Sequence, residues 1–480
     1  MKSLNDKVYK LKSKKKIAAL LLWGLSALCQ AQSLQQVIAM AQDSAITAYQ
    51  SQHEYDYHLA HYAEFEALRK PQLNLLVSPN YSRVISDPTR NYVYLRYYDR
   101  LSAGAQLQFT QKMLDWGGEA YLGTQALWSE YFANDKNGYP RDFVATPILL
   151  GYRQALLGYN PYRWEKAVED QRLKAARQQH SYELHLIAEE ATRRFFRLVC
   201  AQGMLDMCER NKQTADTLYA IAKEKASIAM VTLAELRSLE LQRLNASNAL
   251  FTARNEEQVA RQALMSYLRL DTLNGRMEIP RDPKPLDMTA EEAILLAKTN
   301  SPAWQHQKAT LMEAAHQQQK ALKQRGVNMD LDVNLGFQQV GSNLGEAYRN
   351  QQFYMLGTLS VRLPLMDHGA ARKRYEAATA WTARETDALD EVERALCEDV
   401  LTTLENLHSH QQLLQHTAQA VTMADEVFEL NAENYANGIC DINTYSLAQT
   451  RRDNAYNQHL TALGKYWTTY YHLLTLTQHE

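Results

Sequence analysis

The sequence has little cysteine and lacks the short motifs that mark common catalytic sites. Its 480 residues include five cysteines, with no CxxC pair, and Cys200 and Cys208 lie about 12 Å apart along one predicted helix, too far for a disulfide. A phosphate-binding glycine loop with its lysine and a GxSxG turn are both missing. Glu54, His58 and His61 have helical spacing, but no second cluster completes a zinc site. We therefore expect no disulfide, no enzyme activity, no cofactor and no bound metal.

Long hydrophobic runs are also scarce, with one exception near the start. Seven lysines precede an apolar run from Ile17 to Leu28, and the residues Cys29-Gln30-Ala31 follow. This pattern predicts a secretory signal peptide over residues 1–31, because a membrane anchor needs about 20 apolar residues. Lipid attachment through Cys29 fits less well because the large Leu28 precedes it. No second stretch reaches membrane-spanning length, so the exported chain is expected to be soluble or part of a β-barrel.

The charge balance excludes one class of partner. Without residues 1–31 the chain keeps 45 of its 52 basic and 53 of its 54 acidic side chains, which gives a net charge of −8. A chain of this sign does not attract nucleic acid electrostatically. We therefore expect no nucleic-acid partner.

Much of the sequence is present twice. Matching positions at an offset of 209 include Phe195 with Leu404, Leu198 with Leu407 and Leu205 with Leu414. Nearer the start, the offset is 256, as for Ile38 with Ile294 and Leu75 with Leu331. The duplication predicts one structural unit made twice, over residues 32–287 and 288–480.

Each repeat is expected to contain a short helix, strands and a long helical hairpin. The first repeat has a helix over 34–68, strands at about 72–157, a hairpin over 163–268 and a linker over 271–288. The second has a helix over 290–322, strands at about 328–366 and a hairpin over 370–476. Apolar residues at three- and four-residue spacing, beside charged faces, favour coiled-coil packing of the hairpins. Thr232 with Glu235 predicts a capping box after the first hairpin turn, and Asp441 a helix cap after the second.

The strands show strict alternation of apolar and polar residues. Between 328 and 337 the apolar set is Met329, Leu331, Val333, Leu335 and Phe337. Similar stretches occur at 73–81, 103–112, 120–128, 148–156 and 358–365, and Tyr92, Tyr94, Tyr97 and Tyr98 cluster as in an interfacial girdle. A half-buried soluble sheet and a membrane barrel with a wet interior both have this pattern. Four to six strands cannot close a barrel around a pore, so a barrel would be shared among several chains.

Several local sequences occur in a characteristic order along the chain. They are Ser33-Leu34-Gln35-Gln36-Val37-Ile38 at a helix start, Pro71 before the first strand, Leu156-Leu157-Gly158-Tyr159-Asn160 and Leu365-Met366-Asp367-His368-Gly369 at strand-to-helix junctions, and the turn Tyr435-Ala436-Asn437-Gly438. None is specific alone, but their order, spacing and duplication resemble the outer-membrane efflux protein family, the TolC-like channels. The resemblance covers essentially the whole mature chain.

The resemblance implies a fold that is mainly α with a β-barrel portion. It implies a homotrimer in outer-membrane lipid, with four strands per protomer in a shared barrel and long hairpins in a periplasmic tunnel. The hairpin turns would contact a periplasmic adaptor that joins an inner-membrane pump. By position these turns are Ile228, Ala229, Met230 and Val231, and Gly438, Ile439, Cys440 and Asp441. An extra strand-like hairpin around Gly117 and Gly118 would either enlarge the barrel or extend the extracellular loops.

Two sets of carboxylates are candidate pore residues. Asp425, Glu426, Glu429 and Glu433 precede the second turn, where three copies would form a cation-selective gate. A solvated coiled-coil face gives the same pattern. Asp330 and Asp332 would line the pore if the apolar face of their strand meets lipid.

We expect an outer-membrane channel of a tripartite efflux or type I secretion system, conducting small molecules, metal ions or proteins. The alternative is a periplasmic coiled-coil scaffold with a soluble sheet. The sequence does not identify the cargo or the class of pump.

Overall fold

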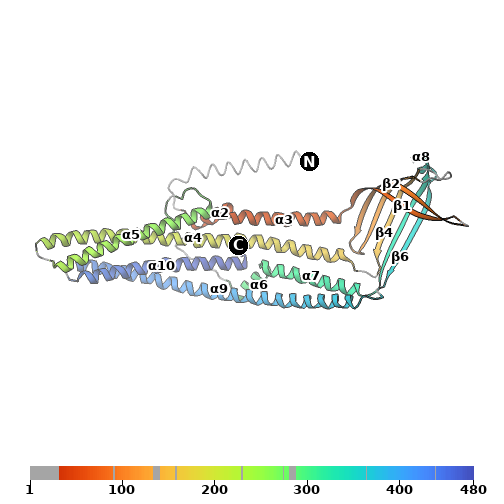
Figure 1. The fold of residues 1–480 in the computed structure, drawn as a ribbon. Coiled ribbons are helices and arrows are strands. Elements are labelled where there is room, and N and C mark those ends of the chain that lie inside the picture. The colour runs from red at the N-terminus through yellow and green to blue at the C-terminus, as the bar shows by residue number, and fades with distance from the viewer. Residues whose placement is uncertain are drawn as a thin grey trace. The chain divides into compact units, whose positions relative to one another are not determined.

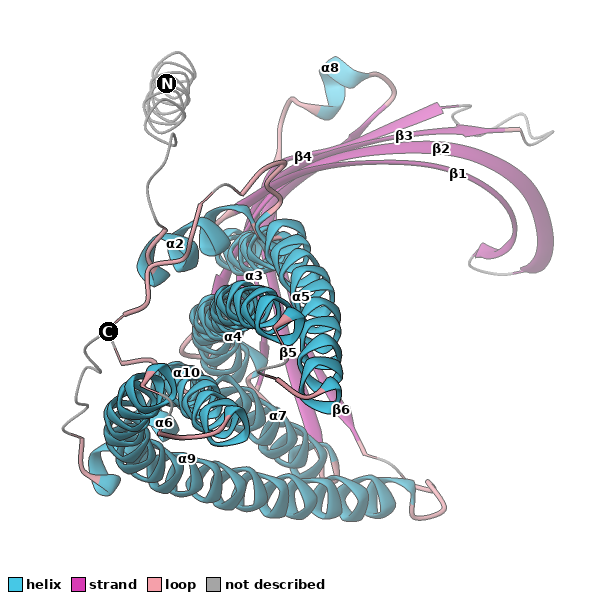
Figure 2. Ribbon diagram, turned by 90° about the vertical axis from the view of Figure 1, so that its left-hand side faces the viewer, coloured by secondary structure: helices cyan, strands magenta, loops and turns pink. Residues whose placement is uncertain are grey.

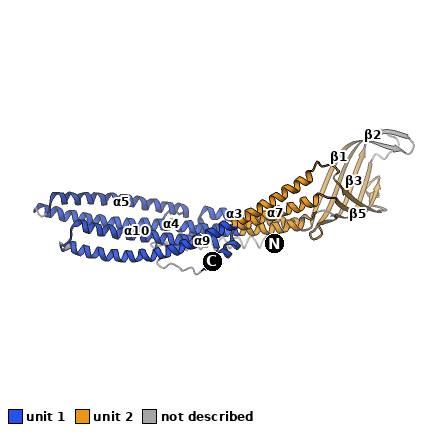
Figure 3. Ribbon diagram, turned by 90° about the horizontal axis from the view of Figure 1, so that it is seen from below, with its two compact units in different colours: residues 1–54, 178–302, 393–480 blue, residues 55–177, 303–392 orange. Residues whose placement is uncertain are grey.

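The computed structural model describes residues 32–89, 92–132, 141–156, 159–228, 231–273, 275–280, 288–363, 365–437 and 439–479. The predicted signal peptide lies outside these ranges. The chain divides into two compact units, coloured separately in Figure 3. Unit 1 contains residues 1–54, 178–302 and 393–480, and unit 2 contains residues 55–177 and 303–392. Each unit thus takes segments from both sequence repeats.

Unit 2 contains a six-stranded antiparallel sheet whose strands follow their order in the sequence (Figures 1 and 2). The strands are β1 (Gln72–Thr89), β2 (Tyr92–Met113), β3 (Gly118–Tyr131), β4 (Arg141–Ala155), β5 (Asn328–Gly341) and β6 (Gln352–Arg362). A helical turn, α8 (Leu344–Ala347), connects β5 to β6. Pairing of β4 with β5 joins the two repeats in one sheet.

The hairpin around Gly117 and Gly118 belongs to this sheet. β2 pairs with β3 continuously from Arg100 with Tyr131 to Met113 with Gly118. The sheet therefore has six strands where the resemblance implies four. β1 and β2 are longer than predicted because their ladder continues as far as Thr89 with Tyr92. β6 ends at Arg362 instead of residue 365, shortly before a proline that has no N–H to donate. The side chains of the tyrosines at 92, 94, 97 and 98 lie outside the described ones.

The strand register gathers apolar side chains on one face of the sheet. Leu331 lies opposite Leu359 and Phe337 opposite Phe353, and Leu75 lies opposite Leu107 on the first two strands. Side chains of this apolar face that are at least 40% exposed are Leu73, Leu75, Val77, Leu107, Phe109, Leu122, Ile148, Leu150, Phe337, Phe353, Met355, Leu359 and Val361. The opposite, polar face carries Asn328, Asp330, Asp332 and Asn334 on β5, although it also includes the exposed apolar side chains of Leu76, Val340 and Leu356.

Two long helical hairpins run through the chain. The first is α4 (Pro161–Ser227) with α5 (Leu233–Leu268), and the second is α9 (Ala370–Ala436) with α10 (Ile442–Thr477). Both long helices have 67 residues and both returning helices have 36. Each helix of the second hairpin begins and ends 209 positions after its counterpart, the offset found in the sequence.

The short helices that we predicted as continuous are each broken. Residues 34–68 form α2 (Leu34–Ser44) and α3 (Ile46–Arg69), and residues 290–322 form α6 (Ala290–Asn300) and α7 (Pro302–Gln324). The backbone at Ala45 and at Ser301 is extended, with ψ of 141° and 120°. A proline after Ser301 disfavours the helical conformation there. The breaks lie 256 positions apart, as do the capping boxes at Ser33 and Thr289.

The core of unit 1 lies among its helices. Phe195 and Leu198 of α4, Leu264 of α5 and Tyr466 of α10 are all at most 1% exposed. Burying an apolar side chain of this size stabilises the fold by about 1.5–3 kcal/mol. The apolar stripe read from the sequence is therefore the seam along which the helices of this unit pack.

The cysteines form no disulfide among the described residues. Cys200, Cys208, Cys397 and Cys440 are all free, and burial raises the pKa of the Cys200 thiol. Among the described residues, no helix is both long and apolar enough to span a membrane.

Candidate functional site

The first hairpin turn connects α4 to α5 in unit 1. Ile228 is 65% exposed, Val231 is half-buried, and Ala229 and Met230 lie outside the described residues. The predicted capping box is present: Thr232 Oγ1 accepts a hydrogen bond from the Glu235 N–H (3.2 Å), and Glu235 Oε2 accepts one from the Thr232 N–H (2.9 Å). The Thr232 N–H stabilises the ionised carboxyl and lowers the pKa of Glu235.

The second turn connects α9 to α10, at the same end of unit 1 as the first (Figure 1). Asp441 caps α10, as predicted, because its Oδ1 accepts hydrogen bonds from Thr444 Oγ1 (2.6 Å) and the Thr444 N–H (2.9 Å). These bonds lower the pKa of Asp441. Ile439 is 73% exposed, Cys440 is half-buried, and Gly438 lies outside the described residues. The turn therefore presents an apolar tip on a fixed helix start.

An aromatic cluster supports this second turn. Tyr445 of α10 packs against Phe428 and Tyr435 of α9, with ring centroids 5.5 and 5.3 Å away. The guanidinium of Arg452 lies 3.9 Å from the centroid of Phe428, a favourable cation–π position. Sequence reasoning missed this cluster, although the seven-residue spacing of Phe428 and Tyr435 places both on one side of α9.

The acidic residues before the second turn are mostly solvent-exposed. Glu426, Glu429 and Glu433 are exposed along one side of α9, and Asp425 is half-buried. Within the described part of the chain none of the four forms an ion pair. The exposed side chains of Met423, Val427 and Leu430 follow the same part of the helix at similar spacing. A single chain thus presents an acidic stripe beside an apolar one, and the predicted gate stays a prediction.

The two strand acids have different surroundings on the polar face of the sheet. Asp332 Oδ2 accepts a hydrogen bond from Arg153 Nε (3.0 Å) on the neighbouring β4, and its Oδ1 accepts one from Asn334 Nδ2 (2.8 Å). The Tyr121 hydroxyl of β3 also reaches Asp332 (3.4 Å) and Asn334. Asp330 is exposed and forms no ion pair with any described residue. Sequence alternation placed both acids on one face but carried no signal for Arg153 or Tyr121.

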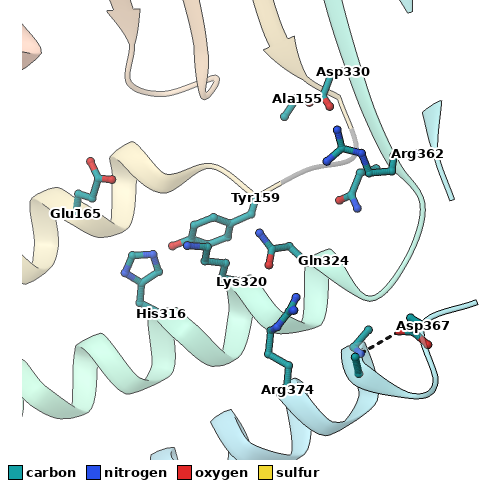
Figure 4. A pocket seen from close by; sticks show the side chains of 13 residues that line it. Ala155, Tyr159, Glu165, His316, Lys320, Gln324, Asp330, Arg362, Asp367 and Arg374 are labelled. Atoms are coloured by element: carbon teal, nitrogen blue, oxygen red, sulfur yellow. Dashed lines mark hydrogen bonds between the residues drawn. The ribbon is translucent and has the colours of Figure 1, made fainter. Parts of the chain in front are cut away.

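A cavity of about 680 Å³ lies in unit 2, where the sheet meets the helices (Figure 4). Its lining residues are Ala155, Tyr159, Glu165, His316, Lys320, Gln324, Asn328, Asp330, Arg362, Asp367, Ala370, Ala371 and Arg374. Tyr159 stacks on His316, with ring centroids 5.1 Å apart, and burial raises the pKa of Tyr159 and lowers that of His316. Of this lining, the sequence had singled out Asp330 alone as a pore residue.

The histidines considered for zinc have other neighbours. His61 Nδ1 lies 3.8 Å from Glu169 Oε2, and Arg172 Nη1 donates to Glu169 Oε1 at 2.6 Å. Across the ranges that the structure describes, no three histidine, cysteine or acidic side chains are arranged to hold a metal ion.

Comparison with known proteins identifies the relatives of this chain. Residues 294–477, which contain β5, β6 and the second hairpin, match the family model described as outer membrane efflux protein. The match covers less than half of the chain and lies within its second repeat. The resemblance seen in the sequence is confirmed. No curated protein matches the chain.

Solved structures extend the similarity to the efflux-protein fold over nearly the whole chain. The Campylobacter jejuni CmeC outer membrane channel matches with a TM-score of 0.66 and 13% identity, over 92% of this chain and 85% of that chain. VceC, an outer membrane protein of Vibrio cholerae, matches with a TM-score of 0.64 and 12% identity, over 92% and 95%. The open state of the Neisseria gonorrhoeae MtrE outer membrane channel matches with a TM-score of 0.61 and 13% identity, over 92% and 88%. The predicted fold class, mainly helical with a TolC-like sheet, is confirmed.

Proposed function

We propose that this chain is one protomer of an outer-membrane export channel. The observation that carries the proposal is the two-sided sheet, which exposes apolar side chains on one face across all six strands and polar side chains on the other. Such a surface suits lipid on one side and water on the other. The likeness to solved outer membrane channels supports the same function.

The edges of the sheet support a barrel that several copies of the chain share. β1 and β6 each pair with one neighbouring strand in this chain, and backbone groups left unpaired in lipid are strongly unfavourable. Because β1 and β6 run in opposite directions, β6 of one copy can pair with β1 of the next. Three copies would close a barrel of eighteen strands, a size that leaves an aqueous passage. We propose this homotrimer in outer-membrane lipid.

The helical hairpins would continue the passage through the periplasm. Their turns carry the exposed Ile228 and Ile439 beside fixed helix starts, a surface suited to a protein partner. We propose that these turns contact a periplasmic adaptor of an inner-membrane pump, in a tripartite efflux or type I secretion system. The channel itself would be passive and non-enzymatic, carrying small molecules, metal ions or proteins.

Conductance across a planar bilayer tests this function. We expect the purified trimer to conduct weakly. The double substitution Asp425→Ala with Glu429→Ala should increase conductance, because the carboxylates of neighbouring copies would no longer bind cations at a closed turn. The control pair is Asp387→Ala with Glu391→Ala, which lie elsewhere on α9. A trimer that never conducts, in either form, would argue against a channel.

Cell fractionation separates the channel from the scaffold alternative. A channel should be found in outer membranes and require detergent for purification. A periplasmic scaffold with a soluble sheet should appear in the soluble periplasmic fraction without detergent. Recovery of a folded, soluble monomer would overturn the channel proposal.

A further inference from the structure

We propose that the cavity between the sheet and the helices binds an oxyanion, a phosphate or carboxylate group, on molecules that pass along the polar face. This inference rests on the proposed channel for its physiological meaning, but the binding site itself does not depend on conduction. The volume of about 680 Å³ is in the range of small-molecule sites.

Three cationic side chains from three different elements converge on the cavity. Lys320 comes from α7, Arg362 from the end of β6 and Arg374 from the first turns of α9. Figure 4 shows the Gln324 side chain between that of Arg362, on the strand side, and that of Arg374, on the helix below. Among the described residues, none of the three cations lies within ion-pair distance of a carboxylate. Two guanidinium groups with an adjacent amide offer the planar donors that phosphate and carboxylate groups accept.

The carboxylates of the cavity do not prevent its cationic side chains from binding an oxyanion. Asp367 is occupied at the start of α9, where Oδ1 accepts from the Gly369 N–H (2.9 Å) and Oδ2 from the Ala371 N–H (3.0 Å). Glu165 lies on α4 near His316, across the cavity from Arg362 (Figure 4). Asp330 lies near Arg362 in Figure 4 and forms no ion pair with any described residue.

The strand residues of the lining place the cavity on the polar face. Asn328 lies opposite Arg362, and Ala155 lies opposite Asp330. All four therefore point to the side of the sheet that carries Asp332 and Asn334, away from the exposed leucines. If that face lines the passage, three copies would place six guanidinium groups around it.

A binding measurement with inorganic phosphate tests the inference on the full-length protein in detergent. We expect wild-type protein to bind phosphate and the variant Arg362→Gln with Arg374→Gln to bind about tenfold more weakly for each guanidinium lost. The matched control is Arg372→Gln with Lys373→Gln, exposed cations of α9 that pair with Glu376 and do not line the cavity. The control should bind as wild type does.

Two further arms complete the test. A measurement with acetate in place of phosphate separates carboxylate recognition from phosphate recognition. The variant Arg362→Lys with Arg374→Lys keeps both positive charges but loses the paired donors of the guanidinium groups, so its affinity for phosphate should be intermediate. Circular dichroism and trimer content establish that each variant is folded. Equal phosphate binding by wild type and the cavity variant, or none by wild type, would overturn the inference. Absence of conductance with normal phosphate binding would count against the channel alone.

Discussion

At the scale of single residues, Asp332 pairs with Arg153 while Asp330, two positions earlier on the same strand, is exposed. Alternation placed Asp330 and Asp332 on one face, yet their surroundings differ because Arg153 reaches Asp332 from a strand that is 179 positions away. Register between distant strands depends on the whole sheet. The caps at Thr232 and Asp441 were predictable because each bonds within three residues of itself.

The turn between β2 and β3 depends on the backbone conformation of Gly117. Gly117 has φ of +74°, and a Cβ there would lie 2.8 Å from Asn160 Cγ. Asn160 holds the turn because its Nδ2 donates to the carbonyl oxygens of Leu114 (3.0 Å) and Asp115 (3.3 Å). Side chain and turn therefore depend on one another across 45 positions of sequence.

We expect Gly117→Ala to destabilise the protein by about 1–2 kcal/mol, because alanine is strained at positive φ and would displace Asn160. The measurement is the midpoint of thermal unfolding in detergent. Gly357→Ala is the control, since a Cβ at Gly357 meets no atom within 4 Å. Equal melting temperatures for the two variants would contradict the strain argument.

At the scale of elements, periodicity predicted the hairpins well and the short helices less well. The returning helix α5 begins directly after the predicted cap at Thr232 and ends at the predicted residue, Leu268, because caps and apolar spacing are local signals. The breaks at Ala45 and Ser301 were missed because the apolar pattern continues across them. Pro302 gave the local signal for the second break, and the duplication could then have located the first.

One polar cluster joins three helices within unit 1. His472 of α10 lies 3.0 Å from Glu189 of α4 and 3.8 Å from Asp399 of α9. The hydrogen bond with Glu189 is the main cause that raises the pKa of His472 above its ordinary value. Protonated His472 therefore ties α10 to both long helices.

We expect the stabilising effect of His472 to be fully present below about pH 6.5, the usual histidine pKa, and to be lost as the pH rises through the raised folded-state value. His472→Gln should therefore lower the melting temperature more at pH 5.5 than at pH 8.5. His408→Gln, at an exposed position of α9, is the control. A loss that is the same at both pH values would exclude the ion pair as its cause.

At the scale of the whole molecule, the apolar face of the sheet is unusual because its side chains are exposed in the single chain. Monomeric soluble proteins rarely expose an apolar patch that crosses an entire sheet. Lipid against this face is part of the function proposed above, and it would account for the exposure of these side chains. Neighbouring residues on β1 allow the two faces to be tested separately.

We expect Leu75→Lys to reduce the amount of folded protein in outer membranes strongly, since a cation facing mid-bilayer lipid costs about 2–4 kcal/mol. Asn74→Lys, one position away on the polar face, should have little effect. Leu75 is 67% exposed in the single chain, so a soluble scaffold would tolerate both lysines. Equal tolerance of the two substitutions would favour the scaffold.

The hairpins, the caps and the alternation of the strands could be predicted from the sequence, because each depends on spacing within a short stretch of chain. The duplication could be predicted because it is visible when the sequence is compared with itself. Three other features could be known from the folded chain alone: the hairpin at Gly117 enters the sheet, Arg153 pairs with Asp332, and Lys320, Arg362 and Arg374 line one cavity. These features join residues tens to hundreds of positions apart. Their proximity follows from strand register and helix packing, which are set by the sum of many contacts and not by any local pattern.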